Sequence, residues 1–557
     1  MNTDPPGLHW QQPEPKPLDL QPGLSLVGLL EQSCQRFAER PAFHSLGTTL
    51  TYSDLDRLSR HFAAWLRSCG LRKGDRIALM MPNILQYPVA LFAALRAGLV
   101  VVNTNPLYTA RELRTQLRDS GARAAVVLEN AAHVLADVRA DTQIEHIVTT
   151  TVGELLPFPK RAVVNLLAHL KHPSPNYELP DAVSLRHALA RGESLAWRAD
   201  AAFNAQKVEP DDVAFLQYTG GTTGVPKGAI LTHRNMVANL EQIGAVWGGL
   251  LEPGREIIIT PLPLYHVFCL TCNCLLFVKY GGLNVLITDP RNIPAFVNEL
   301  SRWRFSMITG VTTLYSALLS NPDFARLDFS RLKLGAAGGM SLHPSIVRQW
   351  RTITGRPLLE GYGLTEASPV VACNSYTETW EGTVGRPVTG TEISIREAGK
   401  EVPRGESGEL CVRGPQVMRG YWNRPEETAQ VLTEGWLRTG DVALLEADGS
   451  IRIVDRKKDM IIVSGFKVFP NEIESVVGAH PAVLECGCTG VPDERSGQAV
   501  AIFVVVRPGQ QLTEAELLDF CRERLTPYKM PKRVEFRATL PKTNVGKVLR
   551  RQLTAVA

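Results

Sequence analysis

Apolar and polar positions alternate along much of the chain in the manner of a mixed α/β protein. Residues 75–81 predict a buried strand, residues 89–97 predict a helix that ends at Gly98, and residues 99–103 predict the next strand. A strand, a helix and a strand in succession favour a parallel sheet covered by helices. The same alternation resumes at Val213 and continues to about Asp455, so we expect a large α/β domain.

Helix signals occur in two further segments. Residues 53–56, Ser-Asp-Leu-Asp, match a capping box, and residues 513–525 predict a helix close to the C-terminus. The apolar residues that continue the first of these helices fall near helical spacing and are Leu55, Leu58, Phe62 and Leu66.

The length of the chain predicts more than one domain. Its 557 residues exceed what one hydrophobic core usually supports. Residues 1–23 are rich in Pro and Gln and predict a flexible N-terminal arm. The composition changes near residues 456–459, after which strands, short turns and two or three helices follow. We therefore expect a large α/β domain over residues 24–455 and a small, mobile α+β domain over residues 456–557.

Residues 155–173 predict an amphipathic helix between prolines. Its apolar face consists of Val163, Leu166, Leu167 and Leu170, and the cations near its ends are Lys160, Arg161, Lys171 and His172. A basic amphipathic helix fits a membrane interface, and it fits equally a surface helix packed on the domain. The pattern leaves both interpretations open.

The run at residues 257–278 is apolar enough to suggest a membrane span. However, Pro261, Pro263, His266 and Asn273 would break the helix and place polar groups at mid-depth. We expect a buried strand, a turn and a core helix instead.

Composition and charge argue against several classes of protein. The 60 basic and 56 acidic residues give a net charge of +4, too small to suggest nucleic-acid binding. The ten cysteines are scattered, which favours reduced thiols in the cytoplasm. Cys269, Cys272 and Cys274 lack a second pair at metal spacing, so we interpret them as core residues. The N-terminus shows no basic segment followed by an apolar one, so no secretory signal is expected.

Residues 218–228, Tyr-Thr-Gly-Gly-Thr-Thr-Gly-Val-Pro-Lys-Gly, form the first chemical motif. They fall between an apolar segment at 213–217 and a helix-like segment at 231–240. The glycines allow a tight turn with inward N–H groups, and the threonines and lysine add hydroxyls and a cation, which suits a polyphosphate. The pattern is not a Walker A loop, because Gly228 follows Lys227 in place of Ser or Thr. A plain Gly/Thr-rich surface loop has the same composition.

Three more motifs follow in order. In residues 360–366, glycines flank Tyr362, whose ring could stack on a purine, and Glu366 could hold a hard cation. A turn packed by a core tyrosine is the alternative. In residues 434–459, Asp441 and Arg456 could hold a ribose diol, or belong to a solvated hairpin. Residues 540–551 carry Lys547 in the pattern Pro-Lys-Thr-x-x-Gly-Lys, whereas Lys542, Arg550 and Arg551 are expected to be solvated.

In this combination and order the motifs resemble those of the acyl-adenylate-forming superfamily, and in particular those of bacterial long-chain fatty acyl-CoA synthetases. The resemblance extends from about Val27 to Leu553 and includes residues 86–89, 102–109 and 454–460. It implies an AMP-forming ligase that uses ATP, CoA and Mg²⁺ to convert a long-chain fatty acid into its CoA thioester at the cytoplasmic membrane face. The ATP-binding residues it implies are Tyr218, Thr219, Gly220, Gly221, Thr222, Thr223, Gly224, Lys227, Gly338, Gly361, Tyr362, Gly363, Thr365, Asp441 and Arg456.

The resemblance also implies roles in catalysis and in the second half-reaction. Lys547, Glu366 and Thr223 correspond to catalytic residues, with Glu366 as the Mg²⁺ ligand, and Lys458 corresponds to an interdomain hinge. The residues that would meet CoA are Gly465 and Lys467, and those that would line the acyl pocket are His266, Val311 and Gly339. From the residues alone, Lys467 is equally a surface lysine and His266 equally a core histidine.

Two other functions fit the same residues. One is adenylation of another carboxylic acid or loading of an acyl carrier protein. The other is a non-catalytic lipid-binding protein, against which the intact Lys547, Glu366 and phosphate loop argue. The sequence leaves open the acyl chain length, contact with a membrane surface and the oligomeric state, a homodimer included.

Overall fold

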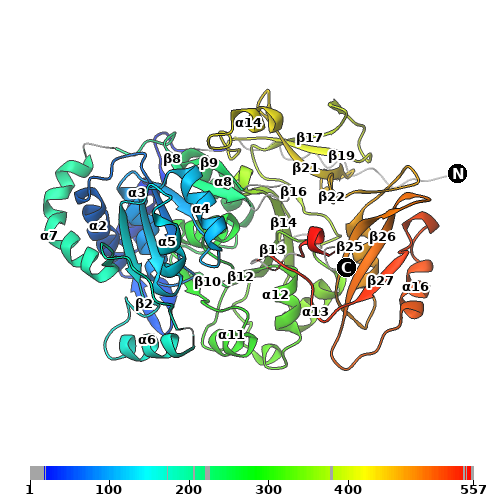
Figure 1. The fold of residues 1–557 in the computed structure, drawn as a ribbon, viewed down its shortest axis with the longest axis horizontal. Helices are drawn as coiled ribbons and strands as arrows, with labels where there is room; N and C mark the ends of the chain where they lie inside the picture. The colour runs from blue at the N-terminus through cyan, green and yellow to red at the C-terminus, as the bar shows by residue number, and fades with distance from the viewer. Residues whose placement is uncertain are drawn as a thin grey trace.

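The computed structural model describes residues 18, 20–171, 173–204, 207–219, 226–376, 380–543, 546 and 548–553. In these residues the chain forms four β-sheets with helices packed on and between them. Figure 1 shows the N-terminal elements at one end of the molecule and β25, β26, β27 and α16 at the other. The protein therefore has a large N-terminal α/β part and a smaller C-terminal α+β part, as the sequence predicts.

The first large sheet has seven strands in the order β7-β6-β5-β3-β4-β8-β9. All its neighbours are parallel except β8 and β9, which are antiparallel. Both strands predicted at 75–81 and 99–103 are present and pair in parallel, as expected. The strands are β3 (Arg76–Met80), β4 (Val100–Asn103), β5 (Ala124–Leu128), β6 (His146–Thr150), β7 (Val183–Ser184), β8 (Val213–Thr219) and β9 (Lys227–Thr232).

The second large sheet has nine strands in the order β16-β15-β14-β13-β12-β10-β11-β1-β2. Its centre is parallel, and antiparallel strands border it on both sides. The strands are β1 (Pro41–Ser45), β2 (Thr48–Thr51), β10 (Ile257–Thr260), β11 (Leu283–Leu286), β12 (Met307–Gly310), β13 (Leu334–Gly338), β14 (Leu358–Gly363), β15 (Val370–Cys373) and β16 (Arg386–Pro387).

Helices cover both large sheets, and an extensive apolar core joins the sheets to α1, α2, α3 and α8. The helix predicted at 89–97 is present and begins three residues earlier. The capping box of α2 uses Thr51 and Asp54, so its prediction at residues 53–56 was wrong by two residues. The helices are α1 (Leu26–Arg36), α2 (Tyr52–Ser68), α3 (Gln86–Arg96), α4 (Ala110–Ser120), α5 (Ala132–Arg139), α6 (Lys160–Lys171), α7 (Leu185–Asn204), α8 (His233–Trp247), α11 (Ile293–Leu300), α12 (Thr312–Leu319) and α13 (Pro344–Thr354).

The apolar run at residues 257–278 is a buried strand followed by a core helix, as predicted. After β10 the chain forms α9 (Val267–Cys269), a π-helical segment (Leu270–Leu275) and α10 (Leu276–Lys279). Cys269, Cys272 and Cys274 are fully buried free thiols in the core, which confirms their interpretation. In the described part of the chain, no helix combines the length and apolarity needed to cross a membrane.

Two smaller sheets complete the fold. The six-stranded one is antiparallel and consists of β17 (Glu392–Glu397), β18 (Lys400–Glu401), β19 (Gly408–Arg413), β20 (Leu432–Thr433), β21 (Trp436–Leu445) and β22 (Ile451–Arg456), with α14 (Pro425–Val431) beside β20. The five-stranded C-terminal sheet consists of β23 (Ile461–Val463), β24 (Phe466–Val468), β25 (Val483–Asp493), β26 (Gly497–Val506) and β27 (Arg533–Phe536). It packs on α15 (Pro470–Gly478) and α16 (Glu514–Arg522) around an apolar core of its own.

Arg550 ties the end of the chain to this C-terminal part. Its guanidinium donates to Glu474 Oε1 at 2.9 Å, to Glu474 Oε2 at 2.7 Å and to Asp455 Oδ1 at 2.8 Å. Only 16% of its side chain is exposed, so the prediction of a solvated Arg550 was wrong. Burial alone lowers the pKa of Arg550, but the two carboxylates outweigh it and hold that pKa above its usual value.

Candidate active site

The loops that follow four neighbouring parallel strands meet at one edge of the nine-stranded sheet. Val311 follows β12, Gly339 follows β13, Tyr362 is the last residue but one of β14, and His266 lies in the segment after β10. The carboxyl ends of parallel strands are where α/β proteins bind their ligands. The topology thus brings together residues that are up to 96 positions apart in the sequence.

Lys227 and Glu366 share one partner, the phenol of Tyr421. The ammonium of Lys227 lies over the Tyr421 ring, 5.3 Å from its centroid, and the Tyr421 hydroxyl donates to Glu366 Oε1 at 2.6 Å. Tyr421 reaches this place because its backbone pairs with Ala229 of β9. The first residue of β9 and the 3₁₀ turn Thr365–Ala367 are therefore held side by side.

Tyr362, Asp441 and Arg456 form a second cluster. The Tyr362 hydroxyl donates to Asp441 Oδ2 at 2.5 Å, and Arg456 Nε lies 3.2 Å from Asp441 Oδ1. Asp441 and Arg456 face each other across β21 and β22, and Asp441 is buried. Burial and the neighbouring Asp441 carboxylate hold the pKa of Tyr362 well above its usual value, so the phenol is a neutral donor.

A cavity of about 310 Å³ opens beside this cluster and is lined by Thr439, Gly440, Asp441, Arg456, Lys457 and Lys458. Burial and the neighbouring Arg456 lower the pKa of Lys458, the predicted hinge residue. Asp441 offers a carboxylate and Arg456 a guanidinium at this wall, which is the donor and acceptor set that a sugar diol requires.

Gly338 lies where a side chain would not fit easily, whereas a Cβ on its neighbour Gly361 would make an ordinary contact, 3.5 Å from the Ala372 carbonyl oxygen. They are partners on β13 and β14, and a Cβ on Gly338 would lie 3.2 Å from the Phe268 ring and 3.4 Å from the Gly361 carbonyl oxygen. Gly363, the last residue of β14, is tighter still, because its Cβ would lie 2.1 Å from the Pro369 carbonyl oxygen. Glycine at Gly338 and Gly363 therefore allows the protein's own backbone and the Phe268 ring to pack closely at this edge.

His266 enters the site uncharged. It is half-buried at the start of α9, where the Phe268 N–H points to its Nδ1 at 3.4 Å. Burial lowers the pKa of His266 to about 4. Beside it, Gln217 of β8 donates to the Tyr265 carbonyl oxygen at 2.7 Å, which links the two large sheets at the site.

The C-terminal segment reaches the wall formed by Val311 and Thr313. Gly546 adopts a φ of +85°, and a Cβ there would lie 2.7 Å from Thr313 Oγ1 and 3.5 Å from Val311 Cγ2. Thr312 in turn donates to the Ser341 carbonyl oxygen at 2.8 Å, next to the Gly339 loop. The residue after Gly546 is Lys547, which itself lies outside the described residues.

The phosphate-loop motif follows β8. Gly220, Gly221, Thr222, Thr223 and Gly224 lie outside the described residues. Tyr218 turns its hydroxyl toward Asp119 at 2.7 Å, and Thr219 ends β8 opposite Lys227. The motif thus joins two antiparallel strands, so its prediction between a strand and a helix was wrong: β9 intervenes before α8 begins at His233.

The structure does not bring the predicted CoA residues to these clusters. Gly465 lies in the exposed turn between β23 and β24, where Ser464 and Gly465 have φ values of 50° and 85°. Lys467 is exposed and pairs with Glu397 of β17 at 3.0 Å. In this arrangement Lys467 is a surface lysine, which is one of its two interpretations from the sequence. A role with CoA would require the C-terminal part to move.

Two residues that position the site received no role in the sequence analysis. Tyr421 lies 55 residues from Glu366 in a loop without a motif, and only its aromatic type gave a signal. Glu360 is buried, accepts from Trp380 Nε1 at 2.9 Å, and has its pKa raised by burial to about 7. It also accepts from the Leu342 N–H at 3.2 Å, so it fixes the loop after β13 against β14.

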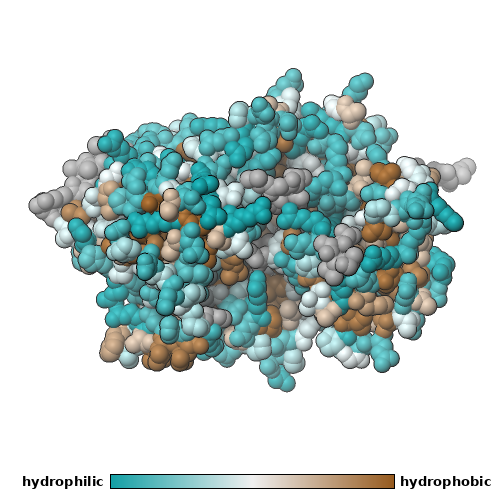
Figure 2. Space-filling view, viewed as in Figure 1, coloured by the Kyte–Doolittle hydropathy of each residue, from teal (hydrophilic) through white to brown (hydrophobic). Residues whose placement is uncertain are grey.

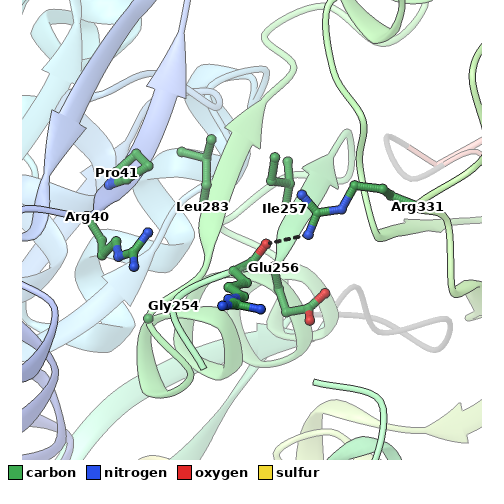
Figure 3. A pocket seen from close by; sticks show the side chains of 9 residues that line it. Arg40, Pro41, Gly254, Glu256, Ile257, Leu283 and Arg331 are labelled. Carbon is green, nitrogen blue, oxygen red and sulfur yellow. Dashed lines mark hydrogen bonds between the residues drawn. The ribbon is translucent and has the colours of Figure 1, made fainter. Parts of the chain in front are cut away.

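A separate cavity of about 490 Å³ lies at the opposite, amino ends of β1, β10 and β11 (Figure 3). Arg40, Arg331 and Glu256 project around it, and Arg331 donates to the Arg255 carbonyl oxygen at 3.4 Å. It contains no residue that the sequence analysis singled out, and the amino edge is not where parallel sheets place their ligands.

Two family models match this chain. Residues 30–422 match the AMP-binding enzyme family, and residues 472–547 match the C-terminal domain of AMP-binding enzymes. The fold and the clusters at the carboxyl edge define an adenylate-forming enzyme, and the chain belongs to the AMP-binding enzyme family.

Its relatives include a long-chain-fatty-acid--CoA ligase of Escherichia coli, which is 54% identical over 95% of this chain and 94% of the relative. Two solved structures are similar in fold. One is the anthranilate CoA ligase AuaEII in complex with anthranoyl-AMP, with a TM-score of 0.82, 25% identity and coverage of 96% of this chain and 98% of that one. The other is ATP-bound MatB from Rhodopseudomonas palustris, with a TM-score of 0.81, 28% identity and coverage of 96% and 99%.

Proposed function

We propose that this protein is an AMP-forming ligase that joins a long-chain fatty acid to CoA at the expense of ATP. The support for the acyl substrate is the named activity of the Escherichia coli relative, whose length this chain covers almost completely. The support for the chemistry is the geometry of the carboxyl edge, where described residues of the four motifs approach the same clusters.

The nucleotide would lie between the two polar clusters. Tyr362 offers a ring beside Gly361 and Gly363, while Asp441 and Arg456 offer partners to the ribose hydroxyls. The triphosphate would extend toward Lys227 and the loop that carries Thr222 and Thr223. Thr219 ends β8, Gly338 ends β13 and Thr365 begins the 3₁₀ turn, and these residues would border the same space. In this arrangement each group would face the part of ATP that its chemistry suits.

The residues present fit a magnesium ion. Glu366 supplies a half-buried carboxylate, one oxygen of which is fixed by Tyr421. Among the described residues there is no group of three His, Cys, Asp or Glu side chains that could hold a metal. Mg²⁺ commonly binds through one or two carboxylates and the phosphates of the substrate, so Glu366 suffices for the protein's share. The ion would neutralise phosphate charge as pyrophosphate leaves.

Two half-reactions then follow. In the first, a carboxylate oxygen attacks the α-phosphorus, an O–P bond forms, and the bond to pyrophosphate breaks. Lys547 would stand between the substrate carboxylate and the α-phosphate and would stabilise the charge that develops there. The close approach of Gly546 to Thr313 supports this placement. In the second, the thiolate of CoA attacks the acyl carbon and AMP leaves, so the thioester forms without further ATP.

The second half-reaction requires a change of position. We place the large domain at residues 24–455, the mobile C-terminal domain at residues 456–557, and the flexible arm at residues 1–23. Rotation about Lys458 would withdraw Lys547 and bring Gly465 and Lys467 to the acyl group. His266, Val311 and Gly339 would line the acyl pocket throughout. We place the enzyme at the cytoplasmic face of the membrane, where its apolar substrate is concentrated.

The observation that carries this proposal is the approach of Gly546 to Thr313, which sets the residue before Lys547 against the acyl-pocket wall. The test is fatty-acid-dependent exchange of pyrophosphate into ATP, together with AMP release measured with and without CoA. We expect exchange that depends on fatty acid and AMP release that rises with CoA. Pyrophosphate exchange accompanied by AMP release that does not rise with CoA would point to a carrier protein as acceptor. The absence of exchange would refute adenylation.

A further inference from the structure

Helix α6 displays its apolar face to solvent. Val163, Leu166, Leu167 and Leu170 recur at helical spacing and are 52–68% exposed. A surface helix normally turns such a face to the core and its polar face to water. In α6 the arrangement is inverted, and no residue of the helix is fully buried.

The opposite face of α6 fixes the helix in this orientation. The Gly153 N–H donates to Asn165 Oδ1 at 2.8 Å, and Asn165 Nδ2 donates to Thr151 Oγ1 at 2.9 Å. Val164 packs against the main core beside Asn165. Asn165 and Val164 therefore attach this face of α6 to the rest of the protein, and their contacts turn the leucines on the opposite face toward solvent.

Neighbouring residues enlarge this apolar surface. Phe158, just before the helix, is 77% exposed, and Leu46 in the turn between β1 and β2 is 38% exposed. The turn lies beside the helix, because a Cβ on Gly47 would lie 2.5 Å from Lys160 Nζ. Of ten exposed large apolar side chains in the described residues, six belong to this surface. Figure 2 shows apolar groups gathered at the lower edge of the molecule, where Figure 1 places α6 below β2. Such a concentration marks an interaction site.

Cations border the apolar face. Lys160 and Arg161 begin the helix and Lys171 ends it. Within the part of the chain that the structure describes, none of the three has a carboxylate within ion-pair distance. Unpaired cations beside apolar side chains complement a surface that is anionic at its boundary and apolar beneath it, which is the interface of a phospholipid bilayer.

We propose that α6, with Leu46 and Phe158, is the surface by which this protein binds an anionic phospholipid bilayer, α6 lying in the plane of the interface. The leucines and Phe158 enter the region between headgroups and acyl chains, and Lys160, Arg161 and Lys171 contact the phosphates. This makes specific the membrane contact that the proposed function includes.

The size of the surface favours a bilayer over a second protein molecule. Helix α6, with 12 residues, is about 18 Å long and about 10 Å wide, so its projected footprint is on the order of 200 Å², to which only the two side chains of Leu46 and Phe158 are added. A stable protein interface buries about 800 Å² on each partner. A bilayer needs no such area or shape complementarity, because an inserted apolar side chain is surrounded by lipid on all sides.

The test is flotation of the full-length protein with vesicles, without ATP or fatty acid. Vesicles with about one third phosphatidylglycerol in phosphatidylcholine are compared with pure phosphatidylcholine. The double variant Leu166→Asp/Leu170→Asp should bind the anionic vesicles at least about tenfold more weakly, and Arg161→Glu/Lys171→Glu should lose most of the preference for anionic lipid. Leu107→Asp, a change at a leucine 62% exposed in the loop after β4, is the matched control and should bind as the parent does.

Circular dichroism and pyrophosphate exchange on the same preparations separate this proposal from the proposed function, because both should be unchanged in the α6 variants. A parent protein that does not float with anionic vesicles, or a Leu166→Asp/Leu170→Asp variant that floats as the parent does, would overturn the proposal. Sedimentation velocity adds a further check, since a parent dimer that this variant converts to monomer would assign the surface to a second copy instead.

Discussion

Tyr421 positions two predicted site residues at once. Its hydroxyl fixes one oxygen of Glu366, and its ring face attracts the ammonium of Lys227. Burial and the Glu366 carboxylate hold the pKa of Tyr421 above its usual value, so the phenol stays a donor at every physiological pH. The orientation of the predicted metal ligand is therefore set by a residue outside every motif.

Tyr421→Phe tests this role, because it removes the hydroxyl and keeps the ring. A hydrogen bond to a charged group contributes about 1.5–3 kcal/mol, so pyrophosphate exchange should fall roughly 10- to 100-fold. The concentration of Mg²⁺ needed for half-maximal exchange should rise in this variant. Tyr177→Phe, at a half-buried tyrosine remote from the motifs, is the control. An unchanged Mg²⁺ dependence in Tyr421→Phe would show that Glu366 does not need this partner.

His233 makes the stability of the fold sensitive to acid. It is buried at the start of α8, where the Leu26 N–H donates to its Nδ1 at 3.3 Å, and burial lowers the pKa of His233 to about 4 from 6.5. Between these values the unfolded chain binds a proton that the folded protein does not. Stability is therefore lost as the pH falls from 6.5 toward 4, by up to about 3 kcal/mol from this group.

His233→Asn supplies an acceptor that does not titrate. Urea unfolding at pH 7.5 and pH 5 should give a smaller loss of stability in this variant than in the parent. Equal losses would mean that His233 is protonated in the folded protein.

Sequence patterns could identify Tyr362, Asp441 and Glu366, because each lies in a stretch rich in glycine and charge. They gave no role to Tyr421, which lies outside the motifs, or to Glu360, which begins the same stretch as Tyr362. The role of Tyr421 depends on a bridge between residues 229 and 421, and that of Glu360 depends on its burial and on the hydrogen bond from Trp380. Both are consequences of tertiary packing, for which the local sequence carries no signal.

Among the elements, Arg550 joins three parts of the chain. It follows the Gly546 segment, its side chain is held by Glu474 of α15, and it also contacts Asp455 at the end of β22. Asp455 is almost fully buried and accepts in addition from the Asn471 N–H at 2.6 Å. The segment before the predicted hinge and the segment that contains Lys547 are thus attached to the same guanidinium.

Arg550→Met should destabilise the C-terminal part strongly, because it leaves two buried carboxylates without their cation. Removal of one partner from a buried ion pair costs about 3–5 kcal/mol. Limited proteolysis and chemical unfolding should both report the loss. Arg522→Met removes an exposed pair with Asp519 and should cost less than about 1 kcal/mol. Equal, small effects of the two changes would contradict the arrangement around Arg550.

Helices and strands with a regular pattern of apolar residues could be predicted from the sequence. Elements whose conformation or orientation depends on pairing and packing with other elements could not. β3, α3 and β4 follow from periodicity and Gly98, since a positive φ of 72° there suits glycine. β9 was missed because its first residues continue the phosphate-loop motif, so pairing with β8 decides its conformation. The pattern of α6 predicted the helix, but only its packing shows that the apolar face points outward.

At the scale of the whole molecule, two large sheets, a small antiparallel sheet and the C-terminal part converge on one region. Lys227 comes from the first sheet, Tyr362 from the second, and Asp441 from the third. Gly546 comes from the C-terminal segment. Movement of the last part alone would complete or open such a site, as the proposed alternation between two half-reactions requires.

The most direct test of this account is the Lys547→Ala variant assayed on each half-reaction separately. Pyrophosphate exchange should fall by more than about 100-fold, as expected when a charge-stabilising group is removed. Transfer from a synthetic fatty acyl-adenylate to CoA should stay close to the parent rate. Lys542→Ala, five residues earlier and paired with Glu485, should leave both rates near those of the parent. An exchange rate in Lys547→Ala equal to that of the parent, or an equal loss in both half-reactions, would contradict the account.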